Sequence, residues 1–131
     1  MKKALLICML LLVHNCFAID WINVTSQKGE TFVLDKDSIT EKNNYYFYNI
    51  RLYSNNADDI VVTMQSQKKH PFCTRIKYYK LSEYESLNGD YANITNNMTD
   101  KLEPVAFTSI AYAAYKKVKN IKLSDVVQIT F

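Results

Sequence analysis

Few side chains in this sequence combine the type and the spacing that catalysis requires. His70 and Cys73 stand three positions apart, and a histidine beside a cysteine could activate the thiol as a nucleophile. In an extended chain, however, residues at this spacing point apart and lie roughly 10 Å from each other. No serine, histidine and acid form a recognisable catalytic set either. We therefore expect a protein that is not an enzyme and that uses no cofactor.

Two pairs of neighbouring carboxylates are the candidates for a metal site, Asp35 with Asp37 and Asp58 with Asp59. A calcium-binding loop needs more oxygen ligands at fixed spacing, and a glycine at its sharp turn. Neither pair has this pattern, so we interpret all four as ordinary turn residues and expect no metal. The chain has only two glycines, which also excludes a glycine-rich phosphate-binding loop.

The richest group of side chains suited to binding lies between residues 68 and 80. Cations alternate there with aromatic rings: Lys68, Lys69, Arg75, Lys77, Tyr78, Tyr79 and Lys80. Arginine and aromatic side chains are enriched where protein partners anchor. We predict that Arg75, Lys77 and Tyr79 share one exposed face of a strand and form a surface for an anionic partner. The alternative interpretation is a solvated strand face without a partner.

Cys73 is the one cysteine that follows residue 18. If the chain is cut at that point, Cys73 has no partner for an intramolecular disulfide. Strand alternation predicts that it lies on the more polar face, together with Arg75 and Lys77. Its thiol is then either buried and inert or paired with a second molecule.

The first eighteen residues predict export. Lys2 and Lys3 precede an unbroken apolar run at 4–13, and small residues occupy the −3 and −1 positions of a cut after Ala18. The run is too short to cross a hydrocarbon core of ~30 Å. We predict a signal peptide at 1–18 and an exported chain in the periplasm or on the surface of a bacterium. The alternative is a cut before Cys16, which would produce a lipoprotein.

The chain that remains, residues 19–131, has the size of a single small domain. It is nearly neutral, because the leader carries two of the lysines that give the whole chain its net charge of +3. Nucleic-acid binding requires a strongly basic face, so we expect no nucleic-acid partner. No second apolar stretch approaches the length of a transmembrane helix.

Alternating apolar residues predict an antiparallel sheet over most of the chain. Five strands are expected, at residues 21–25, 31–35, 45–53, 60–65 and 72–81. The third has the strongest pattern, because Tyr46, Tyr48 and Ile50 share one apolar face while its other face is also aromatic. We therefore expect it at the centre of the sheet. Residues 35–39 are expected to form a polar turn anchored by Ile39.

Asn88-Gly89 is a dipeptide that type I′ turns prefer, because both residues tolerate a positive φ. It predicts a hairpin made of residues 84–87 and 90–94. This hairpin would add to the sheet that the alternating segments form.

After Pro104 the apolar residues recur at helical spacing, from Phe107 to Val118. The spacing predicts an amphipathic helix of about three to four turns that ends at Asn120. Residues 126–131 are either a last strand or a loose tail. The fold class is therefore α+β, a single small domain in which an antiparallel sheet of about five to six strands packs against one C-terminal amphipathic helix.

Several motifs follow one another in a suggestive order between residues 20 and 118. They are Trp21-x-x-Val24, Phe32-Val33-Leu34-Asp35-x-x-Ser38-Ile39, the alternating Tyr46, Tyr48 and Ile50, then Phe72-Cys73 with Arg75-Ile76, Tyr84 before Asn88-Gly89, and Pro104 before the helix. This order resembles the bacterial surface-adhesin protein E family. The resemblance implies an exported protein with an antiparallel sheet and a C-terminal helix. The best-known type in that family is a surface lipoprotein that binds host matrix and plasma proteins.

The sequence departs from the family at one cysteine. Family members usually have a second cysteine near the end of the helix, which can pair with the position that Cys73 matches. Residues 118–120 occupy that region here and no cysteine follows, so the disulfide that the resemblance implies is absent.

From the resemblance we expect an exported, surface-adhesin-like binding protein whose partners are extracellular matrix or other host proteins. The alternative is a periplasmic structural or accessory protein with no host partner. An unpaired sheet edge would also allow a dimer by strand addition, which the sequence leaves open.

Overall fold

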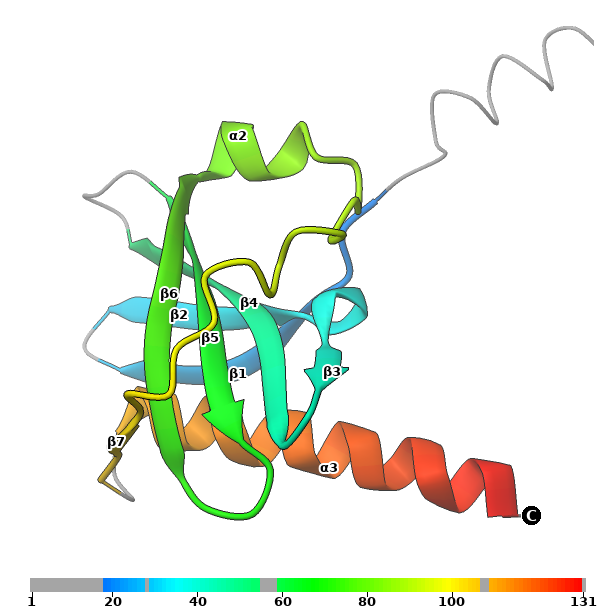
Figure 1. Ribbon diagram of the computed structural model, residues 1–131. Helices are drawn as coiled ribbons and strands as arrows, with labels where there is room; N and C mark the ends of the chain where they lie inside the picture. Colours follow the sequence, from blue (N-terminus) through cyan, green and yellow to red (C-terminus); the bar gives the residue numbers. More distant parts are fainter. Residues whose placement is uncertain (1–17, 28, 55–58, 107–108, 131) are drawn as a thin grey trace, which may run out of the picture.

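The computed structural model describes residues 18–27, 29–54, 59–106 and 109–130. The predicted signal peptide lies outside these residues, except for Ala18. A seven-stranded antiparallel sheet forms one layer of the molecule, and the C-terminal helix lies across one of its faces (Figure 1). The predicted α+β class, with an antiparallel sheet and one C-terminal helix, is confirmed.

The sheet has the strand order β1-β2-β4-β5-β6-β7, and β3 pairs with the start of β4. The strands are β1 Trp21–Gln27, β2 Glu30–Asp35, β3 Thr40–Lys42, β4 Tyr45–Ser54, β5 Ile60–Gln67, β6 Phe72–Lys80 and β7 Glu103–Pro104. The helical elements are the 3-10 turn η1 Lys36–Ser38, α2 Leu81–Glu85 and α3 Ile110–Thr130. The five strands that the sequence predicts are all present, and each end lies within two residues of the prediction.

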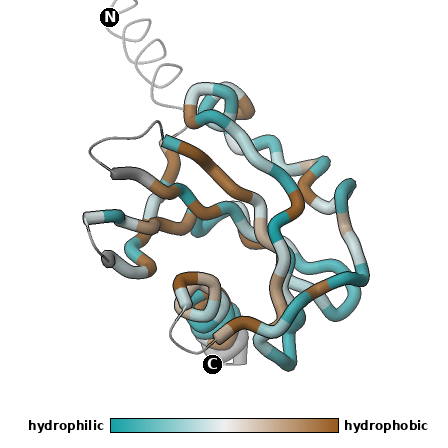
Figure 2. Tube along the Cα trace, turned by 90° about the vertical axis from the view of Figure 1, so that its left-hand side faces the viewer, coloured by the Kyte–Doolittle hydropathy of each residue, from teal (hydrophilic) through white to brown (hydrophobic). Residues whose placement is uncertain are grey.

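The central position predicted for β4 is confirmed, since it pairs with β2 and β3 on one side and with β5 on the other. One face of the sheet packs against α3. This core is formed by Phe32, Leu34, Tyr46, Tyr48, Ile50, Met64, Cys73, Ala114, Tyr115 and Val118. Figure 2, which looks along α3, shows the sheet curving over the helix. Ile39 packs at the margin of this core, as the predicted turn anchor.

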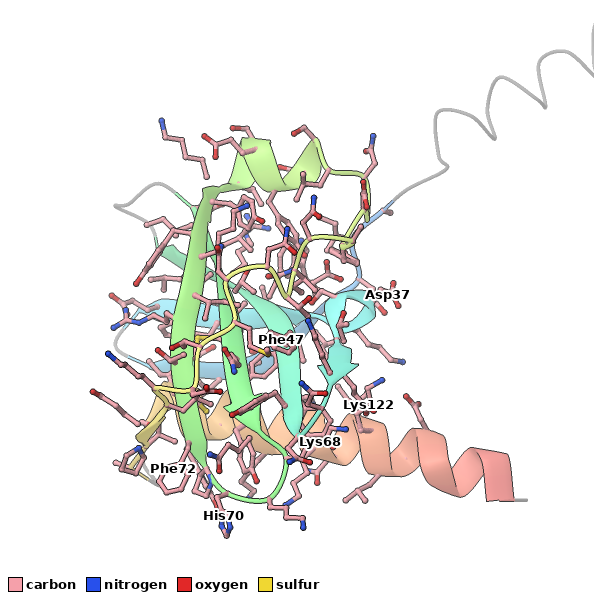
Figure 3. All side chains as sticks on the ribbon, viewed as in Figure 1. Asp37, Phe47, Lys68, His70, Phe72 and Lys122 are labelled. Carbon is pink, nitrogen blue, oxygen red and sulfur yellow. The ribbon has the colours of Figure 1, made fainter. Side chains whose placement is uncertain are left out.

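The other face of the sheet is covered by the segment that contains α2 and the turns after it. The side-chain amide of Gln65 attaches this segment to the sheet, because it donates to the Thr99 carbonyl at 2.8 Å and accepts the Thr99 N–H at 3.0 Å. Phe47, in the middle of this face (Figure 3), is fully buried, and so is nearly all of Tyr84. Both faces of the sheet are thus covered, which accommodates the aromatic side chains that β4 carries on each face.

The hairpin predicted around Asn88-Gly89 is wrong. Both residues do have positive φ angles, 52° and 79°, but they follow the short helix α2 and join no strands. The Asn88 N–H donates to the Glu85 carbonyl at 3.2 Å, so turns continue from the helix. Residues with left-handed backbone also end helices, and the dipeptide alone does not distinguish that use from a hairpin.

The predicted end of the C-terminal helix at Asn120 is also wrong. α3 has 21 residues and continues through Asn120 to Thr130, and its last turns extend past the sheet in Figure 1. The last strand or loose tail predicted at 126–131 is therefore absent up to Thr130, while Phe131 lies outside the described residues. At the other end, the Ser109 hydroxyl accepts the Tyr112 N–H at 3.1 Å, which is the contact of a helix N-cap.

Candidate binding surface

β6 carries the predicted partner surface, and its outer side is largely open. The inner side of β6 pairs with β5 along the strand. The outer side pairs with β7 only at Phe72 and Cys73. In the part of the chain that the structure describes, no strand pairs with the outer side from Thr74 to Lys80. An edge of this kind presents backbone donors and acceptors that lack strand partners.

A β-bulge at Ile76 divides the predicted surface between two faces. Arg75 pairs with Met64, which lies in the core on the α3 side, whereas Lys77 pairs with Thr63 on the opposite side. The register shifts by one residue between these pairs. The extra residue reverses the alternation of side chains. The prediction that Arg75, Lys77 and Tyr79 share one face is therefore wrong.

After the bulge, Tyr78 pairs with Val62 and Tyr79 with Val61. Tyr78 therefore lies on the α3 side of the sheet, together with Arg75 and Lys80. Tyr78 is nevertheless 59% exposed, and it is not among the residues of the core that packs against α3.

The cations of β6 are exposed and are not used in ion pairs within the described residues. We call the exposed side chains Arg75, Lys77, Tyr78 and Lys80 the β6 surface. The ion pairs found among the described residues are formed by Arg51 with Asp59 and by Lys68 with Glu41. The three cations of the β6 surface are thus available to an anionic partner.

Tyr79 packs against a residue of the β6 surface, and it is less exposed than the four residues that form this surface. The Lys77 Nζ lies 4.8 Å from the centre of the Tyr79 ring, a cation–π contact. The Tyr79 ring in turn meets the buried Tyr84 ring edge-on, with 5.7 Å between ring centres. Tyr79 therefore connects the exposed Lys77 to the packed interior.

The lysine-rich loop before β6 is not part of the same surface. The Lys68 Nζ lies 3.4 Å from Glu41 Oε2 and 5.5 Å from the centre of the Tyr46 ring, so Lys68 is held by its own sheet. His70 is exposed, and its ring centre lies 6.0 Å from that of Phe72. Figure 3 shows Lys68, His70 and Phe72 at the end of the sheet where β5 turns into β6, whereas Lys80 is the residue at which β6 ends.

Cys73 lies in the core, and its predicted position on the more polar face is wrong. It is 5% exposed, and it pairs with Ser66 on the α3 side of the sheet, next to Tyr48. Burial raises the pKa of the thiol to about 11. Cys73 is a free thiol, and an intermolecular disulfide would require this core to open. His70, by contrast, is exposed on the preceding loop, so the two side chains form no catalytic pair.

A buried polar cluster around Asp35 occupies the face opposite α3. The Tyr84 hydroxyl donates to Asp35 Oδ2 at 2.5 Å, and the Tyr91 hydroxyl donates to the same oxygen. Asn49 Nδ2 donates to the Tyr84 hydroxyl at 3.0 Å, and its Oδ1 accepts the Thr63 hydroxyl at 2.6 Å. Burial, reinforced by the bond to Asp35, raises the pKa of both tyrosines above the ordinary value. The cluster holds its protons and acts as a structural connection between β2, β4, α2 and the following turns.

The other carboxylates considered for a metal site lie elsewhere. Asp37 is exposed on η1, Asp59 pairs with Arg51, and Asp58 lies outside the described residues. No group of three or more histidine, cysteine, aspartate or glutamate side chains in the described ranges is arranged to hold a metal ion. The depressions found among the described residues lie away from the β6 surface, have volumes of about 200 to 350 Å³ and are all open to solvent.

The fold and the surface define a small α+β domain in which the outer side of β6 is an open sheet edge, with cations that form no ion pair among the described residues. No family model, no curated protein and no solved structure shows a significant match to the chain. Among the helices described, none combines the length and the apolar character that crossing a membrane requires.

Proposed function

We propose that this chain is an exported, non-enzymatic binding protein, similar in role to bacterial surface adhesins, that engages extracellular matrix or plasma proteins of a host through the β6 surface. The observation that carries the proposal is the position of Arg75, Lys77 and Lys80, which are exposed on an open edge and lie outside every ion pair found among the described residues. An arrangement of this kind favours an anionic partner.

Two features of the interior support a binding role over catalysis. The buried thiol of Cys73 has a raised pKa, which suppresses the nucleophilic thiolate. The Asp35 cluster is built from hydrogen bonds between protein groups, and Asp35 itself is only 1% exposed. Neither group is placed to meet a substrate from solution.

The test compares matched charge variants in solid-phase binding to immobilised laminin, fibronectin and plasma proteins. Alanine at Arg75, Lys77 and Lys80 should reduce binding by about tenfold or more, because each exposed charge pair contributes up to about 1 kcal/mol. The control variant carries alanine at Lys36, Lys42 and Lys117, which are also exposed and lie on other elements. Equal binding by both variants would contradict the proposal.

Protease treatment of intact producing cells tests the proposed location. Digestion of the protein on intact cells would support a surface role, and the mass of its N-terminus would distinguish a start at Ile19 from a lipidated start at Cys16. Protection until the envelope is opened would instead favour a periplasmic accessory role without a host partner.

A further inference from the structure

We infer that β6 takes its partner by strand addition, and that the partner supplies an extended acidic segment which pairs with the outer side of β6. This inference rests on the proposed function and specifies how the same surface would bind. It has two independent supports, the open backbone of the edge and the distribution of charge on both faces.

The backbone support comes from the strand register. Every second residue of an edge strand in an antiparallel sheet directs both its N–H and its C=O away from the sheet. Residues 77–80 follow the bulge and pair with β5 in unbroken register, from Thr63 opposite Lys77 to Ile60 opposite Lys80. Their outward groups are therefore spaced to continue the hydrogen-bond ladder into one more strand.

The charge support comes from the bulge at Ile76. It places Arg75 and Lys80 on the α3 side of the sheet, and Lys77 on the opposite side. Side chains of paired strands stand directly opposite one another on each face. A strand added to β6 would therefore meet cations on both of its faces. Its best complement is a segment with acidic side chains on both faces, and not on one alone.

The exposed Tyr78 ring extends the same argument to apolar contacts. It lies on the α3 side between Arg75 and Lys80, where it would face a side chain of the added strand. Aromatic rings paired across strands with β-branched side chains stabilise sheets. We therefore expect valine or isoleucine between the acidic residues of the partner segment.

A second copy of this chain is a poor occupant of the edge. Pairing two β6 strands would bring their lysine and arginine side chains together, and like charges on paired strands are destabilising. Lysines on edge strands protect proteins against such self-pairing. The same charges that oppose a second copy favour an acidic strand, so the partner is another protein.

The experiment uses three labelled peptides and fluorescence polarisation with the exported chain. The first is the acidic peptide Val-Glu-Glu-Val-Glu-Glu-Val, which places glutamates on both faces when extended. The second has lysine in place of each glutamate. The third is the acidic peptide with N-methyl groups on its five central residues, which removes N–H donors from both edges and leaves the charge unchanged.

We expect the acidic peptide to bind and the lysine peptide not to bind. N-methylation should weaken binding by about tenfold or more, because at least two backbone hydrogen bonds are lost. The alanine variant at Arg75, Lys77 and Lys80 should also lose about tenfold, whereas the control at Lys36, Lys42 and Lys117 should not. Equal thermal unfolding temperatures of the two variants would show that the loss does not come from misfolding.

The outcomes separate this inference from the proposed function. If the N-methylated peptide binds as well as its parent, strand addition is wrong, while a charge-dependent surface stands. If no acidic peptide binds but the β6 variant loses matrix binding, the acidic-strand partner is wrong and the proposed function stands. If backbone-dependent peptide binding is found without matrix binding, strand addition stands and the host role falls. Dimerisation that is lost in the β6 variant would also overturn the inference, because it would make a second copy the occupant.

Discussion

The Tyr84 hydroxyl donates a hydrogen bond of 2.5 Å to Asp35 Oδ2, although the two residues lie 49 positions apart in the sequence. Asp35 ends β2, and Tyr84 belongs to α2. Asp35 is almost fully buried, and a buried carboxylate is costly unless hydrogen bonds satisfy it. The Tyr91 hydroxyl donates to the same oxygen. These bonds therefore fix the covering segment to the sheet.

Tyr84→Phe should lower the free energy of unfolding by about 1–3 kcal/mol, because it leaves a buried donor of Asn49 without its acceptor and Asp35 with one donor fewer. Urea unfolding monitored by fluorescence would measure the change. Tyr78→Phe is the matched control, because that ring is exposed and should shift stability by less than about 0.5 kcal/mol. Equal effects of the two substitutions would contradict the structural role of the cluster.

The strands could be predicted because the alternation of apolar residues is visible within each short segment of the sequence. Phe32 and Leu34 alternate with residues of the other face, and so do Tyr46, Tyr48 and Ile50. The structure places both groups on the α3 side. A period of two residues is visible in any short window of sequence. The central position of β4 followed from the same pattern, because both of its faces are rich in aromatic residues.

The arrangement of the β6 surface could not be predicted, because one bulged residue changes it. The sequence around Ile76 alternates without an interruption that marks the bulge, and the extra residue is defined only by its pairing with β5. The bulge places Cys73 and Tyr78 on the same side of the sheet, whereas strict alternation predicts opposite faces. On that side Cys73 is buried and Tyr78 is exposed. Only the high polarity of the segment after residue 73 indicated that its face on the α3 side would remain uncovered.

The Asp35 cluster depends on contacts between residues that are distant in sequence. Asp35 was interpreted as a turn residue, and Tyr84 as part of a hairpin, and neither pattern contains information about the other. The left-handed residues Asn88 and Gly89 fit a helix end as well as a hairpin. Tertiary packing decides between these uses, which explains why this part of the prediction failed.

The raised pKa values of Tyr84 and Tyr91 predict a loss of stability at alkaline pH. Burial is the main cause of both shifts, and the bond to Asp35 adds to it. Below the ordinary tyrosine pKa of 10.0 the hydroxyls are neutral in both the folded and the unfolded chain, so they add no pH dependence there. Above it the unfolded chain releases protons that the folded chain retains, and the free energy of unfolding falls as the pH rises.

Urea midpoints measured from about pH 8 to about pH 12 would check this expectation. The midpoint should decrease as the pH rises above about 10, and the decrease should be smaller in Tyr84→Phe, which lacks one of the shifted groups. Tyrosinate absorbance gives a second readout, since the Tyr84 and Tyr91 hydroxyls should ionise at a higher pH in the folded chain than in the unfolded chain. A midpoint that declines equally in the Tyr84→Phe variant would contradict the assignment to this cluster.

Gln65→Leu should release the segment around Thr99 from the sheet. The substitution removes both hydrogen bonds between the Gln65 amide and the Thr99 backbone, and Gln65 itself is fully buried. We expect a loss of about 1–3 kcal/mol in the free energy of unfolding. Hydrogen exchange at the Thr99 amide should become faster, because that N–H loses its acceptor.

Asn97→Ala is the control for this substitution, because Asn97 is exposed on the same segment. It should leave the exchange rate of the Thr99 amide unchanged. If Gln65→Leu left that rate unchanged as well, the two hydrogen bonds would not be what holds the segment in place.

Cys73 should react with a thiol reagent far more slowly in the folded chain than in the unfolded one. Burial raises the pKa of the thiol from 9.0 to about 11, which alone lowers the thiolate fraction roughly a hundredfold at pH 8. Exclusion of the reagent from the core adds to this effect, because the side chain is almost fully buried. A chain that begins at residue 19 contains no other cysteine, so colour released by an aromatic disulfide reagent would report on Cys73 alone.

A substitution in the core provides the control for the thiol measurement. Val118 is a fully buried residue of α3 that packs in the same core. Val118→Ala shortens its side chain and should lower the free energy of unfolding by about 1–3 kcal/mol. Reaction of Cys73 that requires opening of this core should become faster by the corresponding factor, about fivefold or more. A fast reaction in the unaltered folded chain would instead show that Cys73 is accessible, and it would restore the intermolecular disulfide as an interpretation of this residue.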